Sequence, residues 1–175
     1  YGYSVASLYC LGFVTGGIMS PITGPLVDKI GRKRSAILYC VLEMFINWLE
    51  QFPFLPGLIA SRMIGGFTTN LLSQVFETWL DTEYRQRCLD KDKYEIIMRD
   101  SVIVSNVAAI YSGYLAHILA ESYGPAGPFA GAVTCTAIAL IAVSAAWTEN
   151  YGYEEGAMNT KDTMSLLREA MELFR

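Results

Sequence analysis

The sequence predicts an all-α membrane protein, on three observations. The chain has 175 residues, of which 53% are hydrophobic and 17% are charged. The charges are clustered, because residues 1–27 contain no Asp, Glu, Lys or Arg and residues 35–61 contain only Glu43 and Glu50. The uncharged runs are long enough for helices that cross a bilayer, which need about 20 residues. A soluble helical domain would instead place charges along the solvent face of every helix, so we expect an integral membrane protein.

The distribution of basic residues predicts how the chain crosses the bilayer. Of the 13 Lys and Arg, all except Arg62 lie in residues 29–34, 85–99 and 161–175. The two expected loops on the opposite side, at 53–56 and 121–128, contain no base. Basic connections usually stay in the cytoplasm. We therefore expect a multi-pass protein of the plasma membrane or an endomembrane, with its basic loops cytoplasmic. The five expected spans lie at about residues 4–24, 35–52, 57–79, 101–120 and 128–147.

Two of the expected spans contain small residues at every fourth position. Such a stripe allows the backbone of a neighbouring helix to approach closely, which is a common packing device in membranes. Pro21 and Pro25 follow near the end of the first span, where a helix can kink or end. The stripes are Gly12, Gly16, Ser20 and Gly24 in the first span, and Ser101, Ser105, Ala109 and Gly113 in the fourth.

The chain divides into two expected units, a transmembrane bundle at 1–148 and a polar linker at 149–175. Because the sequence starts at Tyr1 and stops within a helical pattern, we expect it to be a piece of a longer protein. The linker is predicted to contain a cytoplasmic amphipathic helix on the membrane surface or under the bundle. Its apolar residues, three and four positions apart, are Met164, Leu167, Met171 and Phe174.

The most specific motif lies between the first two expected spans. It reads Gly24-Pro-Leu-Val-Asp28-Lys29-Ile-Gly31-Arg32-Lys33-Arg34. This run resembles the signature loop between the second and third transmembrane helices of the major facilitator superfamily. The resemblance implies that the five spans correspond to helices 2–6 of a twelve-helix transporter. The first helix and the C-terminal half of that transporter would then be the partners of these five helices within the same protein.

Three further stretches are similar to the molybdate-anion transporter family within that superfamily. They are Ser61-Arg62-Met-Ile-Gly65-Gly66, Phe76-Glu77-Thr-Trp79-Leu-Asp81-Thr-Glu83 and Trp147-Thr-Glu149-Asn150-Tyr151-Gly152. The resemblance implies import of molybdate or a similar tetrahedral oxyanion by alternating access between two halves. The alternatives are a sugar or organic anion as substrate, or a membrane scaffold or sensor that does not transport. A soluble interaction domain is a third alternative, which the uncharged runs oppose.

The motif itself allows two interpretations. In the first interpretation, the motif is a basic turn whose charges only set the orientation of the protein in the membrane. Alternatively, the two glycines allow tight turns and Asp28 can pair with Arg32, while the resemblance implies that Asp28 faces the absent half and that the loop latches the outward-open state. Glu77 and Asp81 are expected partners of Arg32. The predicted latch comprises Gly24, Asp28, Gly31, Arg32, Lys33, Glu77 and Asp81.

Polar residues within the spans are the candidates for substrate binding. Arg62 suits an oxyanion because a guanidinium presents forked donors, although its side chain can instead reach the outer interface. Glu43, with Asn47 one turn away, is expected to be protonated, paired with Arg62 or involved in proton coupling. Asn70 and Gln74 are one turn apart and donate hydrogen bonds either to substrate or to a neighbouring helix.

Other kinds of chemistry find little support in the sequence. The four cysteines have no metal-like spacing, and no nucleophile elbow or phosphate-binding glycine loop is present. We expect no enzymatic activity, no cofactor or metal, and no binding to nucleic acid. The expected partners are the lipid bilayer, the rest of the protein and a small anionic substrate.

Overall fold

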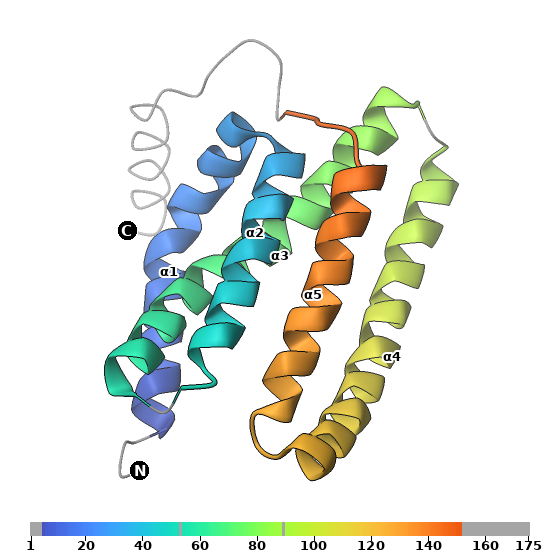
Figure 1. Cartoon of the computed structure of the whole chain (residues 1–175). Helices are drawn as coiled ribbons and strands as arrows, with labels where there is room; N and C mark the ends of the chain where they lie inside the picture. Colours follow the sequence, from blue (N-terminus) through green and yellow to red (C-terminus); the bar gives the residue numbers. More distant parts are fainter. Residues whose placement is uncertain (1–4, 53, 89, 152–175) are drawn as a thin grey trace.

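Five α-helices form the described part of the chain in the computed structural model, which covers residues 5–52, 54–88 and 90–151 (Figure 1). The prediction of an all-α fold is confirmed. The helices are α1 (Val5–Ile30), α2 (Arg32–Leu49), α3 (Leu55–Gln86), α4 (Lys91–Tyr123) and α5 (Gly127–Ala146).

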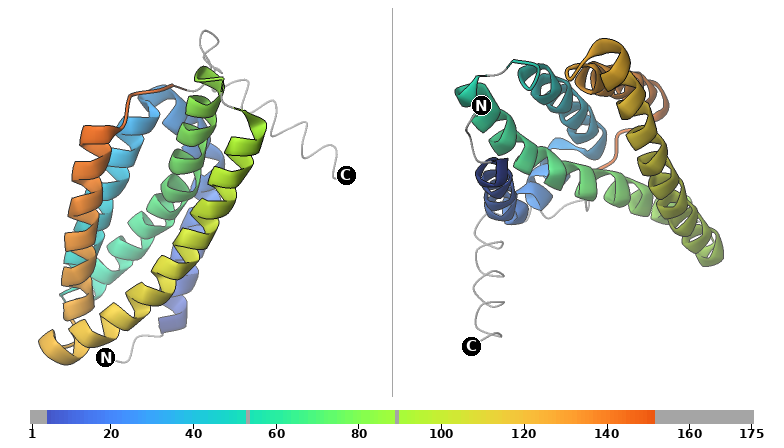
Figure 2. Two further views of the ribbon diagram at one scale, coloured as in Figure 1. Left: turned by 90° about the vertical axis from the view of Figure 1, so that its right-hand side faces the viewer. Right: turned by 90° about the horizontal axis from the view of Figure 1, so that it is seen from below.

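The helices pack in an order that differs from their order in the chain. α3 lies obliquely against α1 and α2, α2 also packs on α5, and α4 packs mainly on α5 (Figures 1 and 2). No residue of α4 is buried among the described residues. By length and composition, α1, α4 and α5 are apolar enough to cross a membrane. α2 and α3 carry more polar groups but run through the same bundle, as a multi-pass membrane protein requires.

Figure 1 shows that the connections alternate between two ends of the bundle. The break between α1 and α2, the connection from α3 to α4 and residues 147–151 lie at one end. We call it the basic end, because it contains the bases of residues 29–34 and 85–93. The α2–α3 and α4–α5 connections lie at the opposite end. The hydrophobic core is near the basic end and comprises Val27, Ala36, Leu71, Val75 and Val143.

The first span is longer than the sequence predicts. α1 continues through Pro21 and Pro25 to Ile30, so Gly24 lies inside a helix and not in a turn. Proline costs about 3 kcal/mol within an exposed helix, but membrane helices tolerate it because neighbouring groups satisfy the freed carbonyls. The expected loop is reduced to Gly31, with φ 100° and ψ 144°.

The small-residue stripe of α1 packs closely on α3. A Cβ atom added to Gly66 would lie 2.5 Å from the Gly12 carbonyl oxygen and 2.7 Å from the Gly16 nitrogen. The predicted role of this stripe in helix packing is confirmed. The stripe of α4 is exposed, and no described atom lies within 4 Å of a Cβ built on Gly113.

The most charged segment, residues 81–100, is largely helical. α3 extends to Gln86 and α4 begins at Lys91. Pairs four residues apart stabilise these helix ends: Arg85 Nε lies 3.0 Å from Asp81 Oδ2, and Lys91 Nζ lies 3.8 Å from Glu95 Oε1. The amphipathic helix expected at 160–175 lies outside the described residues.

Candidate functional site

A cavity of about 540 Å³ lies among α1, α2 and α3, toward the end opposite the basic end. Its polar lining comes mostly from α2 and α3, while α1 contributes Tyr9, Phe13, Ser20 and three glycines. The polar side chains in the lining are Tyr9, Ser20, Glu43, Asn47, Glu50, Ser61, Arg62, Thr68, Thr69 and Asn70.

Arg62 is paired with Glu50 in this cavity. Arg62 Nη2 lies 2.8 Å from Glu50 Oε1, and the Ser61 hydroxyl donates to the same oxygen at 3.1 Å. The ring of Tyr9 lies 5.0 Å from the guanidinium carbon, within range of a cation–π contact. The Glu50 side chain is only 9% exposed, whereas that of Arg62 is 31% exposed. The guanidinium is thus accessible while its counter-ion is buried.

The expectation that Arg62 pairs with Glu43 is wrong, and the reason is depth. α2 and α3 run antiparallel, so Arg62, near the start of α3, lies level with Glu50 at the end of α2. Glu43 is seven residues earlier in α2, which places it about 10 Å deeper along the helix.

Glu43 is surrounded by neutral donors. Its Oε2 accepts a hydrogen bond from the Thr68 hydroxyl at 3.2 Å, and its Oε1 lies 3.4 Å from Asn47 Nδ2. The same Asn47 nitrogen donates to the Glu43 carbonyl oxygen at 2.8 Å. Among the described residues, no basic side chain lies within ion-pair distance of this carboxylate.

The two amide residues of α3 are in different environments. Asn70 lines the cavity, and its Nδ2 donates to the Gly16 carbonyl oxygen at 2.7 Å, so it joins α3 to α1. Gln74 lies one turn closer to the basic end and does not line the cavity. Its Oε1 is buried, and a Cβ built on Gly24 would lie 3.4 Å from it.

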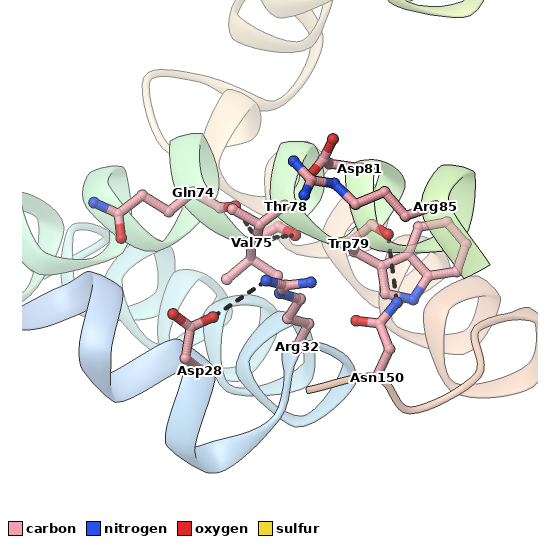
Figure 3. A network of polar contacts seen from close by, with 9 residues as sticks. All are labelled: Asp28, Arg32, Gln74, Val75, Thr78, Trp79, Asp81, Arg85 and Asn150. Atoms are coloured by element: carbon pink, nitrogen blue, oxygen red, sulfur yellow. Dashed lines mark hydrogen bonds and ion pairs between the residues drawn. The ribbon is translucent and has the colours of Figure 1, made fainter. Parts of the chain in front are cut away.

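The expected pairing of Arg32 with Asp28 is confirmed, whereas Arg32 pairs with neither Glu77 nor Asp81. Its Nη2 lies 3.2 Å from Asp28 Oδ1, Asp81 pairs with Arg85, and Glu77 is exposed. In Figure 3 the guanidinium points toward α3 near Val75, whereas the Asp81 carboxylate points away from it. The break at Gly31 brings Arg32 back over Asp28, which accounts for the pairing observed. Nε and Nη1 of Arg32 are buried without a described partner.

Residues 147–151, which follow α5, form hydrogen bonds with the start of α2. Glu149 Oε1 accepts a hydrogen bond from the Lys33 backbone N–H at 2.9 Å, and the Asn150 carbonyl oxygen accepts one from the Arg32 N–H at 3.0 Å. These bonds satisfy two N–H groups that a helix N-terminus leaves without partners. A Cβ on Gly31 would lie 2.6 Å from Glu149 Oε1. Glycine is therefore required both by the backbone angle and by this carboxylate.

The same segment also contacts the end of α3. The rings of Trp79 and Trp147 stack with centroids 4.1 Å apart, and Trp79 Nε1 donates to the Thr148 carbonyl oxygen at 3.1 Å. Asn150 Nδ2 donates to the Trp79 carbonyl oxygen at 3.3 Å (Figure 3). We call residues 79, 83 and 147–150 the end clamp. Two of the stretches on which the family resemblance rests therefore meet in space.

Glu83 is the buried carboxylate of the end clamp. The Thr148 hydroxyl donates to its Oε1 at 2.8 Å, and Arg87 Nε donates to its Oε2 at 2.8 Å. Burial by itself raises the pKa of Glu83. The hydrogen bonds from Thr148 and Arg87, the Arg87 charge and Asn150 outweigh burial and lower the pKa below its ordinary value. No local sequence pattern marks Glu83, because its partners Thr148 and Asn150 are distant in the chain.

Comparison with known proteins agrees with this architecture. Residues 1–172 match the model of a major facilitator family described as sugar transporters with 12 TM. A molybdate-anion transporter of Xenopus laevis is 30% identical over 153 residues, covering 85% of this chain and 34% of the relative. The corresponding protein of Xenopus tropicalis is 31% identical over 153 residues, covering 85% of the chain and 33% of the relative.

More distant relatives have the same description. A molybdate-anion transporter of Takifugu rubripes is 26% identical over 167 residues, covering 93% of the chain and 34% of the relative. The chain spans about a third of the length of these curated relatives. No solved structure matches the chain significantly. On the match of the family model to nearly its whole length, the chain belongs to this major facilitator family of membrane transporters.

Proposed function

We propose that the protein imports molybdate or a similar tetrahedral oxyanion as a secondary active transporter, by alternating access between two halves. The observation that supports an anion is Arg62, a partly exposed guanidinium in a cavity among membrane helices. Its ion pair with Glu50 engages Nη2, and a guanidinium has further N–H groups that suit an oxyanion. The names of the relatives support molybdate in particular.

A sugar is the second candidate substrate, because the family model is described by sugar transport. A neutral sugar gains little from the charge of a guanidinium, whereas an oxyanion gains both charge and paired hydrogen bonds. The cavity therefore favours the anion. A membrane scaffold or sensor that does not transport is the remaining alternative.

We assign the basic end to the conformational change and to the cytoplasmic side of a plasma membrane or endomembrane. Asp28, Arg32 and Gly31 form its centre, and Lys33 Nζ donates to the Ser144 carbonyl oxygen at 2.8 Å. Breaking and remaking such contacts is how a latch would favour one of two states. Two nitrogen atoms of Arg32 without described partners support a further contact in another state.

Molybdate uptake tests this proposal directly. Cells expressing the protein at its full natural length should accumulate molybdate, and Arg62→Ala should reduce uptake to the level of cells without the protein at equal membrane expression. Excess tungstate or sulfate should compete, and excess glucose should not. Since Arg62→Ala leaves Glu50 without its counter-ion, the double variant Glu50→Gln/Arg62→Ala is the matched control for folding. Glucose uptake without molybdate uptake would overturn the oxyanion proposal, and uptake of neither solute would favour the scaffold.

A further inference from the structure

We propose that Gly17 of α1 and Gly65 of α3 are specificity-determining residues of the cavity. Because they have no side chains, they leave the space in which the solute lies beside Arg62, and so they set the largest solute that the cavity accepts. The proposal rests on the oxyanion transport proposed above. We call Gly17 and Gly65 the open glycines.

The glycines of the cavity lining are the starting point. All of them lie within α1 or α3, where glycine is less favourable than alanine because its backbone loses more freedom on folding. A glycine is used where the backbone must approach another segment or a ligand closely. The glycines that line the cavity are Gly12, Gly16, Gly17, Gly65 and Gly66.

Three of these glycines are explained by the contact between α1 and α3. A Cβ built on Gly12 would lie 3.3 Å from the Arg62 carbonyl oxygen, and one built on Gly16 would lie 3.3 Å from the Gly66 carbonyl oxygen. The Cβ of a residue at 66 would lie only 2.5 Å from the Gly12 carbonyl oxygen. These three glycines are therefore needed for helix packing.

The open glycines have no such explanation. Within the described part of the chain, no atom lies within 4 Å of a Cβ built on Gly17 or Gly65. Gly65 is half-buried and Gly17 is exposed, yet both line the cavity. A side chain at either position would therefore meet no helix and would take up space in the cavity. This leaves the close approach of a ligand as the reason for glycine.

The position of Gly65 relative to Arg62 links it to the candidate anion site. Arg62, Gly65 and Thr69 are three and four residues apart, so they share one face of α3, and all three line the cavity. The Thr69 hydroxyl donates to the Gly65 carbonyl oxygen at 2.8 Å, so it is turned back on its own helix. The turn next to Arg62 thus presents only backbone to the cavity, which leaves room for a tetrahedral anion.

Gly113 provides the matched control. It also lies within a helix, and no described atom lies within 4 Å of a Cβ built on it. Unlike the open glycines, it belongs to α4 and does not line the cavity. Alanine at 113 gives the same gain in helix propensity as alanine at 65, but it does not narrow the cavity.

Uptake of oxyanions by cells that express the full-length protein tests the proposal. At equal membrane expression, Gly65→Ala should lower molybdate uptake by about tenfold, a typical effect of one methyl group in a binding pocket, and Gly65→Leu should abolish it. Sulfate is a smaller tetrahedral anion, so it should compete relatively better against molybdate in Gly65→Ala than in the natural protein. Gly113→Ala should leave uptake unchanged. Unchanged molybdate uptake by Gly65→Leu would overturn the proposal.

Thermal unfolding separates a role in solute size from a role in packing. Gly65→Ala should be at least as stable as the natural protein, because alanine favours the helix and meets no neighbouring helix. A lower unfolding temperature together with lower uptake would mean that Gly65 packs against another part of the full-length protein. That result would also overturn the proposal.

Thiol labelling gives a readout that does not depend on transport. The variant Gly65→Cys in the full-length protein should react with the charged reagent sulfonatoethyl methanethiosulfonate, and excess molybdate should slow the reaction. Gly17→Cys should behave in the same way, and mass spectrometry of peptides distinguishes these labels from labels on the natural cysteines.

The pattern of protection separates this proposal from the proposed substrate. Labelling of Gly65→Cys that is slowed by glucose but not by molybdate would overturn the oxyanion and leave the role of Gly65 standing. Labelling that neither solute slows would overturn the role of Gly65, even if the protein takes up molybdate. Absence of labelling would do the same, because another segment would then cover this position.

Discussion

At the basic end, residues 147–151 bond to both α2 and α3, whereas at the opposite end α1, α2 and α3 line an open cavity of about 540 Å³. The basic end contains the hydrophobic core and the stacked Trp79–Trp147 pair. The other end contains glycines and the half-buried ion pair of Arg62 and Glu50. The motif at 24–34 and two of the three family stretches lie at the basic end, where the helices are held together, while the third stretch and the candidate binding residues lie where packing is incomplete.

This difference predicts that substitutions at the two ends fail in different ways. Changes in the end clamp should lower stability first and transport only as a consequence. For substitutions at the cavity, the effects on stability and on transport should be separable, so that a second substitution can restore stability while transport stays lost.

The largest effect is expected for the ion pair in the cavity. Arg62→Ala should lower the free energy of unfolding by about 3 kcal/mol, because Glu50 is left buried without a counter-ion. Glu50→Gln/Arg62→Ala should recover most of this loss while molybdate uptake stays absent. Thermal unfolding in detergent measures the change in stability, and molybdate uptake by cells measures transport. Recovery of transport together with stability would mean that Arg62 is structural and that the comparison between the two ends fails.

The contact between α1 and α3 should give the next effect. Gly66→Ala should destabilise the protein by about 1–3 kcal/mol, because its Cβ meets the backbone of α1. Gly65→Ala is the matched control, since no described atom lies within 4 Å of its added Cβ. Because alanine is a better helix former than glycine, Gly65→Ala should be neutral or stabilising. Equal loss in both variants would show that the close approach of α1 and α3 does not limit stability.

Much of the fold could be predicted because a bilayer imposes simple rules. Charge segregation indicated a membrane bundle, and the stripe of Gly12 and Gly16 indicated a close helix contact that α3 supplies. Helix ends were harder to predict. Proline usually ends a helix in water, yet α1 continues through both prolines, and the charged run at 81–100 is helical because its own side chains pair along the helix.

The candidate site was only partly predictable, because pairing depends on depth in the bundle. Arg62, Glu43, Asn47 and Asn70 were expected in one site, and all four line one cavity. Gln74 does not line it, although it lies only one turn from Asn70. The partner of Arg62 could have been found by counting back from the α2–α3 turn, which places Glu50 level with it. The end clamp requires contacts across about 70 residues, for which periodicity gives no signal.

The start of α2 provides a prediction of intermediate size. Glu149→Ala should cost about 1 kcal/mol, because the partly buried Lys33 N–H loses its acceptor. Glu149→Gln keeps an acceptor oxygen but loses the weak pair with Arg34, whose Nε lies 3.7 Å from Glu149 Oε2. It should therefore cost less than 1 kcal/mol, as exposed pairs do. Thermal unfolding of the two variants distinguishes a helix cap from a charge effect, and equal losses would favour the charge.

The smallest effect is expected from the titration of Glu83. Because its pKa is lowered in the folded protein, the ionised carboxylate stabilises the fold at neutral pH. That stability is fully present above the ordinary glutamate pKa of about 4.3 and is lost as the pH falls through the lower folded value. Glu83→Gln should thus be less stable than the natural protein by about 1 kcal/mol at pH 7, and the difference should shrink below about pH 4. Glu77→Gln is the matched control, since Glu77 is exposed on the same helix and its replacement should leave the pH dependence unchanged. A stability difference for Glu83→Gln that stays constant from pH 7 to pH 3 would contradict this prediction. It would mean that the end clamp is stabilised by the packing of this side chain and not by its charge.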